Sequence, residues 1–185
     1  MNHPLARLER QQRKRWFWAW LVPTLLVMLI LQIVGGPLQT PAAPRGIVSY
    51  EFAGTAERAA AILAGWDERV RVHAAFSLGF DYLFMPLYAM TIALGCLWAA
   101  ERWRWRPLAG LGGVLAWGVW LAAALDAVEN LALWQLLTGA VTDPWPVLAW
   151  WSALVKFILI GLGLLYILAG AIAGLERSRT GSAAA

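Results

Sequence analysis

Five polar or charged residues interrupt the long apolar runs of this chain. Asp81 lies in one run and Lys156 in another, while Asp126, Glu129 and Asn130 share the run between them. Their spacings of three and four residues place the last three on one face of a helix. A charge deep in an apolar span costs about 2.5–3.5 kcal/mol on insertion scales, so it needs a partner or a function. Carboxyls beside an amine could exchange protons, bind a cationic or hydroxyl-bearing ligand, or supply acid–base chemistry.

The depth of these groups follows from counting residues to the polar ends of their runs. Asp81, Glu129 and Lys156 each lie about nine or ten residues inward, which is about 14–15 Å at the rise of an α-helix. We therefore expect three helices to bring opposite charges to one level, with Lys156 paired to a carboxylate. Three carboxyls face one ammonium, so a shared proton, water or a bound cation would have to offset the excess.

Four more side chains could extend this site. Ser77 and Tyr88 lie on the same stripe as Asp81, and Ser152 lies one turn before the lysine. His73, at the outer end, could exchange protons with Asp81, although a solvated boundary histidine is the alternative. A purely structural clamp is equally consistent with the pattern, because interhelical hydrogen bonds hold membrane helices together at about 0.6 kcal/mol each.

The composition indicates a membrane protein. Apolar residues make up 61% of the 185 residues and charged residues only 14%, which is more apolar surface than a soluble domain of this size can bury. Thirteen tryptophans fit long boundaries between lipid and water. The arginines lie at the ends of apolar runs and form no stripe with stacking aromatics, so no nucleic-acid partner is expected.

Cysteine and histidine are too scarce for several kinds of chemistry. Cys96 is the single cysteine, and His3 and His73 are the two histidines. These residues cannot form an internal disulfide, a structural zinc site or a pair of axial haem ligands within the membrane. We therefore expect no cofactor and no metal.

The elements that would position the charged groups are four membrane-spanning helices in one bundle, an all-α fold. A basic tail (1–15) precedes them and a tail expected to be disordered (176–185) follows. The predicted spans cover about 16–34, 72–100, 108–137 and 147–175. Gly35, Gly36 and Pro37 should end the first span, and Pro86 should kink the second.

A short helix over 55–64 is predicted on the outer membrane surface, between the first and second spans. Thr55 could cap its start and Gly65 its end, and Asp67 could cap the next span. Ten of the 15 lysines and arginines lie in the two tails and the 101–107 turn. The positive-inside rule then places both termini in the cytoplasm and this helix on the opposite side.

Two segments resemble an uncharacterised group of bacterial four-helix membrane proteins. They are residues 77–84 (Ser-Leu-Gly-Phe-Asp-Tyr-Leu-Phe) and 125–130 (Leu-Asp-Ala-Val-Glu-Asn), and residues 50–55 (Tyr-Glu-Phe-Ala-Gly-Thr) are similar too. The resemblance covers most of residues 47–137. It implies an integral protein of the bacterial inner membrane and implies no activity. The acidic spacing does not resemble that of sterol-isomerase membrane enzymes, which pair a histidine with glutamates.

Three functional hypotheses remain open at this stage. The first is a site for a small or lipid-like ligand, with or without proton exchange, formed by the five charged and polar residues. The second is an accessory subunit of a larger membrane complex, or a homo-oligomer, that associates through Gly170 and Gly174, since small residues four apart allow close helix approach. The third is a membrane enzyme acting on lipid, for which no nucleophile or metal motif is present. Membrane lipids are partners in every case.

Overall fold

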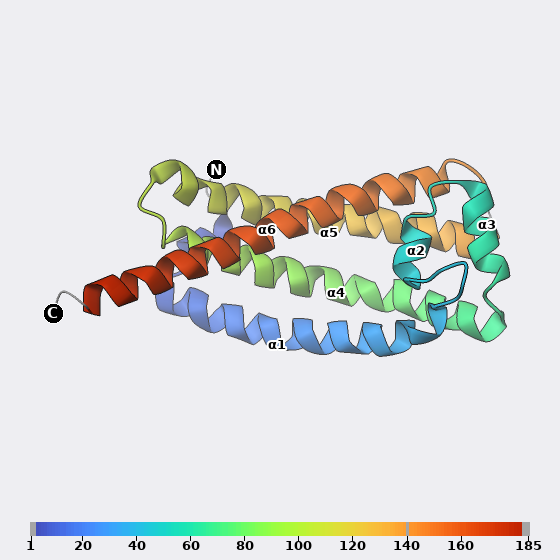
Figure 1. The fold of residues 1–185 in the computed structure, drawn as a ribbon, viewed down its shortest axis with the longest axis horizontal. Helices are drawn as coiled ribbons and strands as arrows, with labels where there is room; N and C mark the ends of the chain where they lie inside the picture. The colour runs from blue at the N-terminus through green and yellow to red at the C-terminus, as the bar shows by residue number, and fades with distance from the viewer. Residues whose placement is uncertain (1–2, 140, 183–185) are drawn as a thin grey trace.

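A computed structural model describes residues 3–139 and 141–182, with side chains described as far as Leu175. Over these residues the chain is helical and contains no strand (Figure 1). Four long helices dominate, and each is long and apolar enough to cross a membrane. They are α1 (Arg10–Gly35), α4 (Glu68–Ala100), α5 (Arg106–Leu137) and α6 (Trp145–Ser182). The prediction of four long apolar helices is confirmed.

Short helices connect α1 to α4 at one end of the molecule, the right-hand end of Figure 1. They are η2 (Gly36–Leu38), α2 (Ile47–Glu51) and α3 (Ala56–Ala64), and a further turn, η1 (Pro4–Arg7), precedes α1. The predicted caps are present: the Thr55 side chain accepts a hydrogen bond from the Arg58 N–H, and Asp67 accepts one from the Val70 N–H at 2.8 Å. Gly65 ends α3 as expected.

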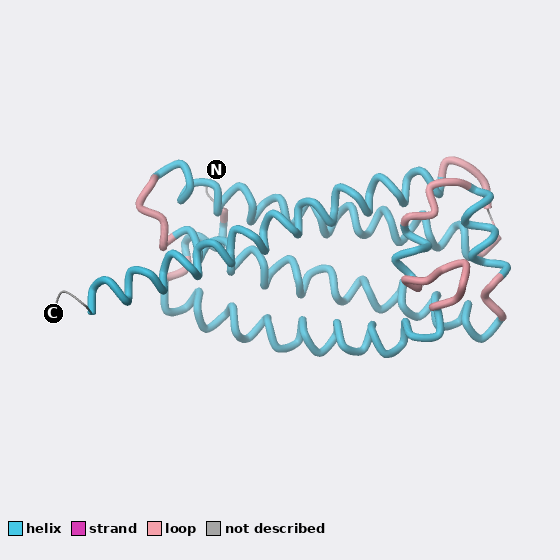
Figure 2. The backbone as a smooth tube through the Cα atoms, in the orientation of Figure 1, coloured by secondary structure: helices cyan, strands magenta, loops and turns pink. Residues whose placement is uncertain are grey.

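The long helices run side by side, with α4 in the middle. Helix α5 packs along both α4 and α6, whereas α1 packs mainly along α4 (Figure 2). Buried side chains form one cluster beneath the short helices and another towards the opposite end of α4, α5 and α6. Helices α1 and α6 make few contacts with each other. The face of α4 that lies between them is therefore left partly uncovered.

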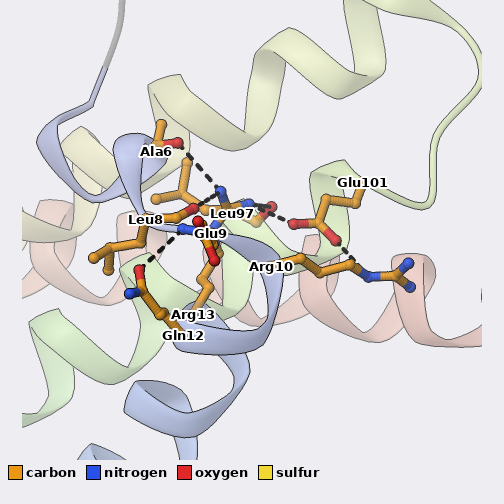
Figure 3. A network of polar contacts seen from close by, with 8 residues as sticks. All are labelled: Ala6, Leu8, Glu9, Arg10, Gln12, Arg13, Leu97 and Glu101. Carbon is orange, nitrogen blue, oxygen red and sulfur yellow. Dashed lines mark hydrogen bonds and ion pairs between the residues drawn. The ribbon is translucent and has the colours of Figure 1, made fainter.

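The amino-terminal segment fastens α1 to the end of α4. The Arg13 guanidinium is 9% exposed and donates hydrogen bonds to Leu97 O at 3.2 Å and to the Glu101 carboxylate at 2.6 Å. It also donates to the backbone oxygens of Ala6 and Leu8 (Figure 3). Arg10 reaches the other Glu101 oxygen at 3.1 Å. A residue counted in the sequence as part of a basic tail is therefore a buried anchor.

The ends of the elements differ from the predictions in a few places. Helix α1 ends at Gly35 as expected but starts at Arg10, within the predicted tail. Helix α4 continues through Pro86, and its kink stays a prediction. Helix α6 extends to Ser182, past the predicted end of the fourth span, and the last three residues of the predicted disordered tail lie outside the described residues.

Gly170 faces α4 of the same chain, and Gly174 faces the turn that follows α4. A Cβ atom added at Gly170 would lie 2.7 Å from the Cβ of Ala99, and one added at Gly174 would lie 2.5 Å from the Arg102 guanidinium. The close approach that small residues permit is thus used within the molecule. Association through these glycines stays a prediction, and it would have to use a face that α4 already covers.

Candidate functional site: a carboxylate–lysine cluster beside a cavity

Lys156 lies at the centre of a buried ion cluster formed by α5 and α6. Its Nζ donates a hydrogen bond to Asp126 Oδ1 at 2.8 Å and lies 2.7 Å from Glu129 Oε2. Lys156 is 5% exposed and Glu129 is 0% exposed, so neither charge is solvated. Burying charges is costly unless they are paired and hydrogen-bonded, which explains why both carboxylates converge on one ammonium.

Helix α4 contributes two more polar side chains to the cluster. The Tyr88 hydroxyl donates to the second oxygen of Asp126, Oδ2, at 2.9 Å. Asp81 accepts a hydrogen bond at 2.8 Å from the Asn130 amide, which also donates to Leu78 O at 3.3 Å. Asp81 therefore joins the cluster through a neutral amide, and it forms no ion pair with any residue whose side chain the structure describes.

The structure thus brings together all five residues that the sequence singled out, from three different helices. Asp126, Glu129 and Asn130 share one face of α5, as their spacing predicted. Four further side chains were predicted to extend the site. Of these, Tyr88 contacts the cluster directly and Ser77 is buried nearby. What the cluster does stays a prediction, because geometry alone does not distinguish a site from a clamp.

The other two of these four side chains, His73 and Ser152, lie elsewhere. The His73 ring faces α1, where Nδ1 lies 3.2 Å from the carbonyl oxygen of Val34, so it does not line the cavity beside Asp81. Ser152 is buried on α6 but does not line the cavity either. Both placements depend on how each helix is rotated about its axis. Residue spacing shows which side chains share one face of a helix, but not which neighbouring helix that face meets.

Glu51 is a fourth carboxyl of this cluster, and the sequence analysis did not select it. It is the last residue of α2, is 8% exposed and lines the same cavity as Asp126 and Lys156. Glu51 and Glu129 would repel each other as carboxylates, so a proton on either one would lower the cost of burying both. Burial raises the pKa of the Glu51 carboxyl, and the nearby Lys156 ammonium opposes that change.

Helix α2 can carry Glu51 into the bundle because its flanks are specifically held. Gly46 precedes it at φ +58°, a backbone conformation that residues with a Cβ rarely adopt. The Tyr50 hydroxyl donates to Leu133 O of α5 at 3.2 Å, and the Phe52 ring stacks on Phe157 of α6 at 5.9 Å. A five-residue helix is too short to show a periodic pattern, so only its place within the segment of residues 50–55 could have drawn attention to Glu51.

A cavity of about 330 Å³ lies directly beside the cluster. Its polar lining includes Glu51, Ser77, Asp81, Asp126 and Lys156. Its apolar lining comes from α1, α2, α4 and α6, and Gln32, Gln39 and Arg45 also line it. The volume lies at the lower end of the range that is usual for small-molecule pockets, about 300–1,000 Å³.

The charges around this cavity do not balance. Four carboxyls (Glu51, Asp81, Asp126, Glu129) face the single ammonium of Lys156, and Arg45 at the rim is exposed to solvent. With every carboxyl ionised the cluster would carry a net charge of about −3, which a low-dielectric site cannot sustain. Protons, water in the cavity or a cationic ligand must offset the excess. Within residues 3–139 and 141–175, no three histidine, cysteine, aspartate or glutamate side chains are arranged so that they could hold a metal ion.

Comparison of the chain with protein-family models, with curated proteins and with solved structures found no match in any of the three. The function must therefore be inferred from the site itself.

Proposed function

We propose that this chain is a multi-pass protein of the bacterial cytoplasmic membrane that binds a small or lipid-like ligand in the cavity beside Asp126 and Lys156, and that protons exchange at the cluster during binding. Both termini lie in the cytoplasm, and the cavity lies in the outer half of the membrane. The observation that carries the proposal is the cavity itself, because a clamp between helices needs the ion pairs but no space beside them.

The orientation is supported by where the basic residues lie. The start of α1, the turn between α4 and α5, and the last turns of α6 all lie at one end of the molecule (Figure 1). The ten lysines and arginines of the two tails and the 101–107 turn belong to this end. The positive-inside rule assigns such an end to the cytoplasm.

Proton exchange is supported by the carboxyl excess. Glu51 and Glu129 are buried carboxyls served by the single ammonium of Lys156, so a proton on one of them would lower the cost of burying both, and Asp81 has only a neutral amide as its hydrogen-bond partner. A cation that enters the cavity would displace such a proton, because it favours the ionised form of the carboxyls around it. Ligand binding should therefore tighten as pH rises.

The cavity is tested by filling it. Leu31 of α1 lines the cavity, whereas Leu29 on the same helix is exposed and does not. Leu31→Trp should reduce the lipid that remains bound to the purified protein, as measured by native mass spectrometry in a mild detergent, and Leu29→Trp should not. Equal lipid retention by both variants and the wild type would refute the proposal.

A second pair of variants on α4 checks that result from the buried side. Ser77 lines the cavity, and a Cβ added at Gly79 would meet no atom within 4 Å. Ser77→Leu should lose bound lipid and Gly79→Leu should keep it. Thermal unfolding of each variant, followed by tryptophan fluorescence, confirms that it is folded before the lipid is counted.

A further inference from the structure

Three polar groups that line the cavity have unused hydrogen-bonding capacity. Ser77 is 5% exposed, and its hydroxyl has no hydrogen-bond partner among the described residues. Glu51 Oε2 is buried and is also unpartnered within that part of the chain. Asp81 has one oxygen on Asn130 and no cation in contact over the same residues. Buried polar groups are almost always paired, so Ser77 and Glu51 point to a missing donor, and the half-buried Asp81 carboxyl lacks a counter-ion.

All three groups line the same cavity and all can accept a hydrogen bond. Two of them are carboxyls, and carboxylates that line one cavity repel one another when both are ionised. A protonated primary amine offers three N–H donors and one positive charge on a compact group. It would supply a donor to each acceptor and offset the charge excess that Lys156 leaves.

The cavity also has an extended apolar lining. Its lining residues on α4 run from Ser77 to Tyr88, a rise of about 16 Å along the helix. Leu31 and Met28 of α1 line one side and Ile160 of α6 lines another. Since α1 and α6 do not pack closely together, an acyl chain could lie between them in contact with the surrounding lipid.

Resting on the function proposed above, we infer that the ligand is a membrane amphiphile with a protonated primary amine in its headgroup. The amine lies against Asp81 and Glu51, and the hydrocarbon chain lies between α1 and α6. The amine could belong to a phospholipid headgroup or to a simple long-chain amine. In the phospholipid case, Arg45 at the outer rim is the residue placed to pair with the phosphate.

The test compares amphiphiles that differ only in the headgroup. Dodecylamine is compared with dodecanol, and lysophosphatidylethanolamine with lysophosphatidylcholine of the same chain length. Kd is measured for the detergent-purified full chain from ligand-dependent thermal stabilisation. We expect the amine-bearing member of at least one pair to bind about tenfold more tightly than its partner, since a desolvated charge pair is worth at least that factor.

The isosteric variants Asp81→Asn and Glu51→Gln should abolish this preference, because amine binding should weaken to the level of dodecanol binding. If only dodecylamine binds more tightly than its partner, the ligand is a simple long-chain amine. A preference shown by lysophosphatidylethanolamine, weakened by Arg45→Gln, assigns the phospholipid. If each amine and its partner bind equally, the amine assignment is overturned and the cavity stands as a binding site. If no amphiphile stabilises the wild type more than Leu31→Trp, both this inference and the proposed function fail.

Discussion

Replacing Lys156 by methionine tests whether the cluster is buried and paired as the structure has it. Methionine keeps the length and the apolar stem of the side chain but removes the ammonium that Asp126 and Glu129 share at 2.8 and 2.7 Å. Removing one partner of a buried ion pair typically destabilises a protein by about 3–5 kcal/mol. The orphaned carboxyls can escape part of this cost by taking up protons.

The cost of that escape depends on pH and sets the expected result. Protonating a carboxyl of ordinary pKa, about 4, at pH 7 costs about 4 kcal/mol, and the cost falls by about 1.4 kcal/mol for each unit of lower pH. Folded Lys156→Met then holds more protons than its unfolded chain, so its stability must fall as pH rises. Its stability deficit relative to the wild type should therefore grow by about 1.4 kcal/mol per pH unit between pH 5 and 7.

The assay is equilibrium unfolding in mixed detergent micelles at several pH values, followed by the fluorescence of the 13 tryptophans. The triple variant Lys156→Met/Asp126→Asn/Glu129→Gln is the control, because it removes the charges together and should recover most of the loss at pH 7. It also provides a folded comparison if Lys156→Met alone does not fold. A deficit below about 1 kcal/mol with no pH dependence would show that Lys156 is hydrated, and the reasoning about a dry cluster would be refuted.

Three other predictions concern stability. Arg13→Gln should destabilise the protein by about 2–4 kcal/mol, because it removes a buried cation that is hydrogen-bonded to three backbone oxygens. It also leaves Glu101 with the exposed Arg10 as its remaining partner. Unfolding in the same micelles measures the loss. Gly112→Ala should destabilise by about 1–3 kcal/mol, since its Cβ would lie 2.7 Å from that of Ala100. Burial raises the pKa of Glu51, so its contribution to stability falls as pH rises above its unfolded pKa. Glu51→Gln should therefore make the wild-type pH profile flatter above about pH 5.

Each of these has an outcome that would contradict it. Arg13→Gln with wild-type stability would mean that the amino-terminal segment does not hold α1. Gly110→Ala is the matched control for Gly112→Ala, because nothing lies within 4 Å of its added Cβ and alanine favours a helix by about 1 kcal/mol. Equal effects of the two glycine variants would contradict the close packing. A Glu51→Gln profile parallel to that of the wild type would place Glu51 in water.

Much of this protein was determined by the sequence alone, because the relevant signals are local. Apolar runs of sufficient length predicted the four long helices, and Thr55, Gly65 and Asp67 predicted where the short helix ends and the next begins. The common depth of Asp81, Glu129 and Lys156 followed from the fixed rise per residue of a helix. The sequence could therefore predict that these side chains lie at one level of the bundle.

Only the tertiary structure decided which groups face one another at that level. The rotation of a helix about its axis depends on how whole helices pack, so it directed His73 to α1 and the Gly170 face to α4. The position of Glu51 depends on a five-residue helix held by contacts with α5 and α6, residues more than 80 positions away in sequence. No local pattern records such contacts, and the cavity between α1 and α6 exists only because of them.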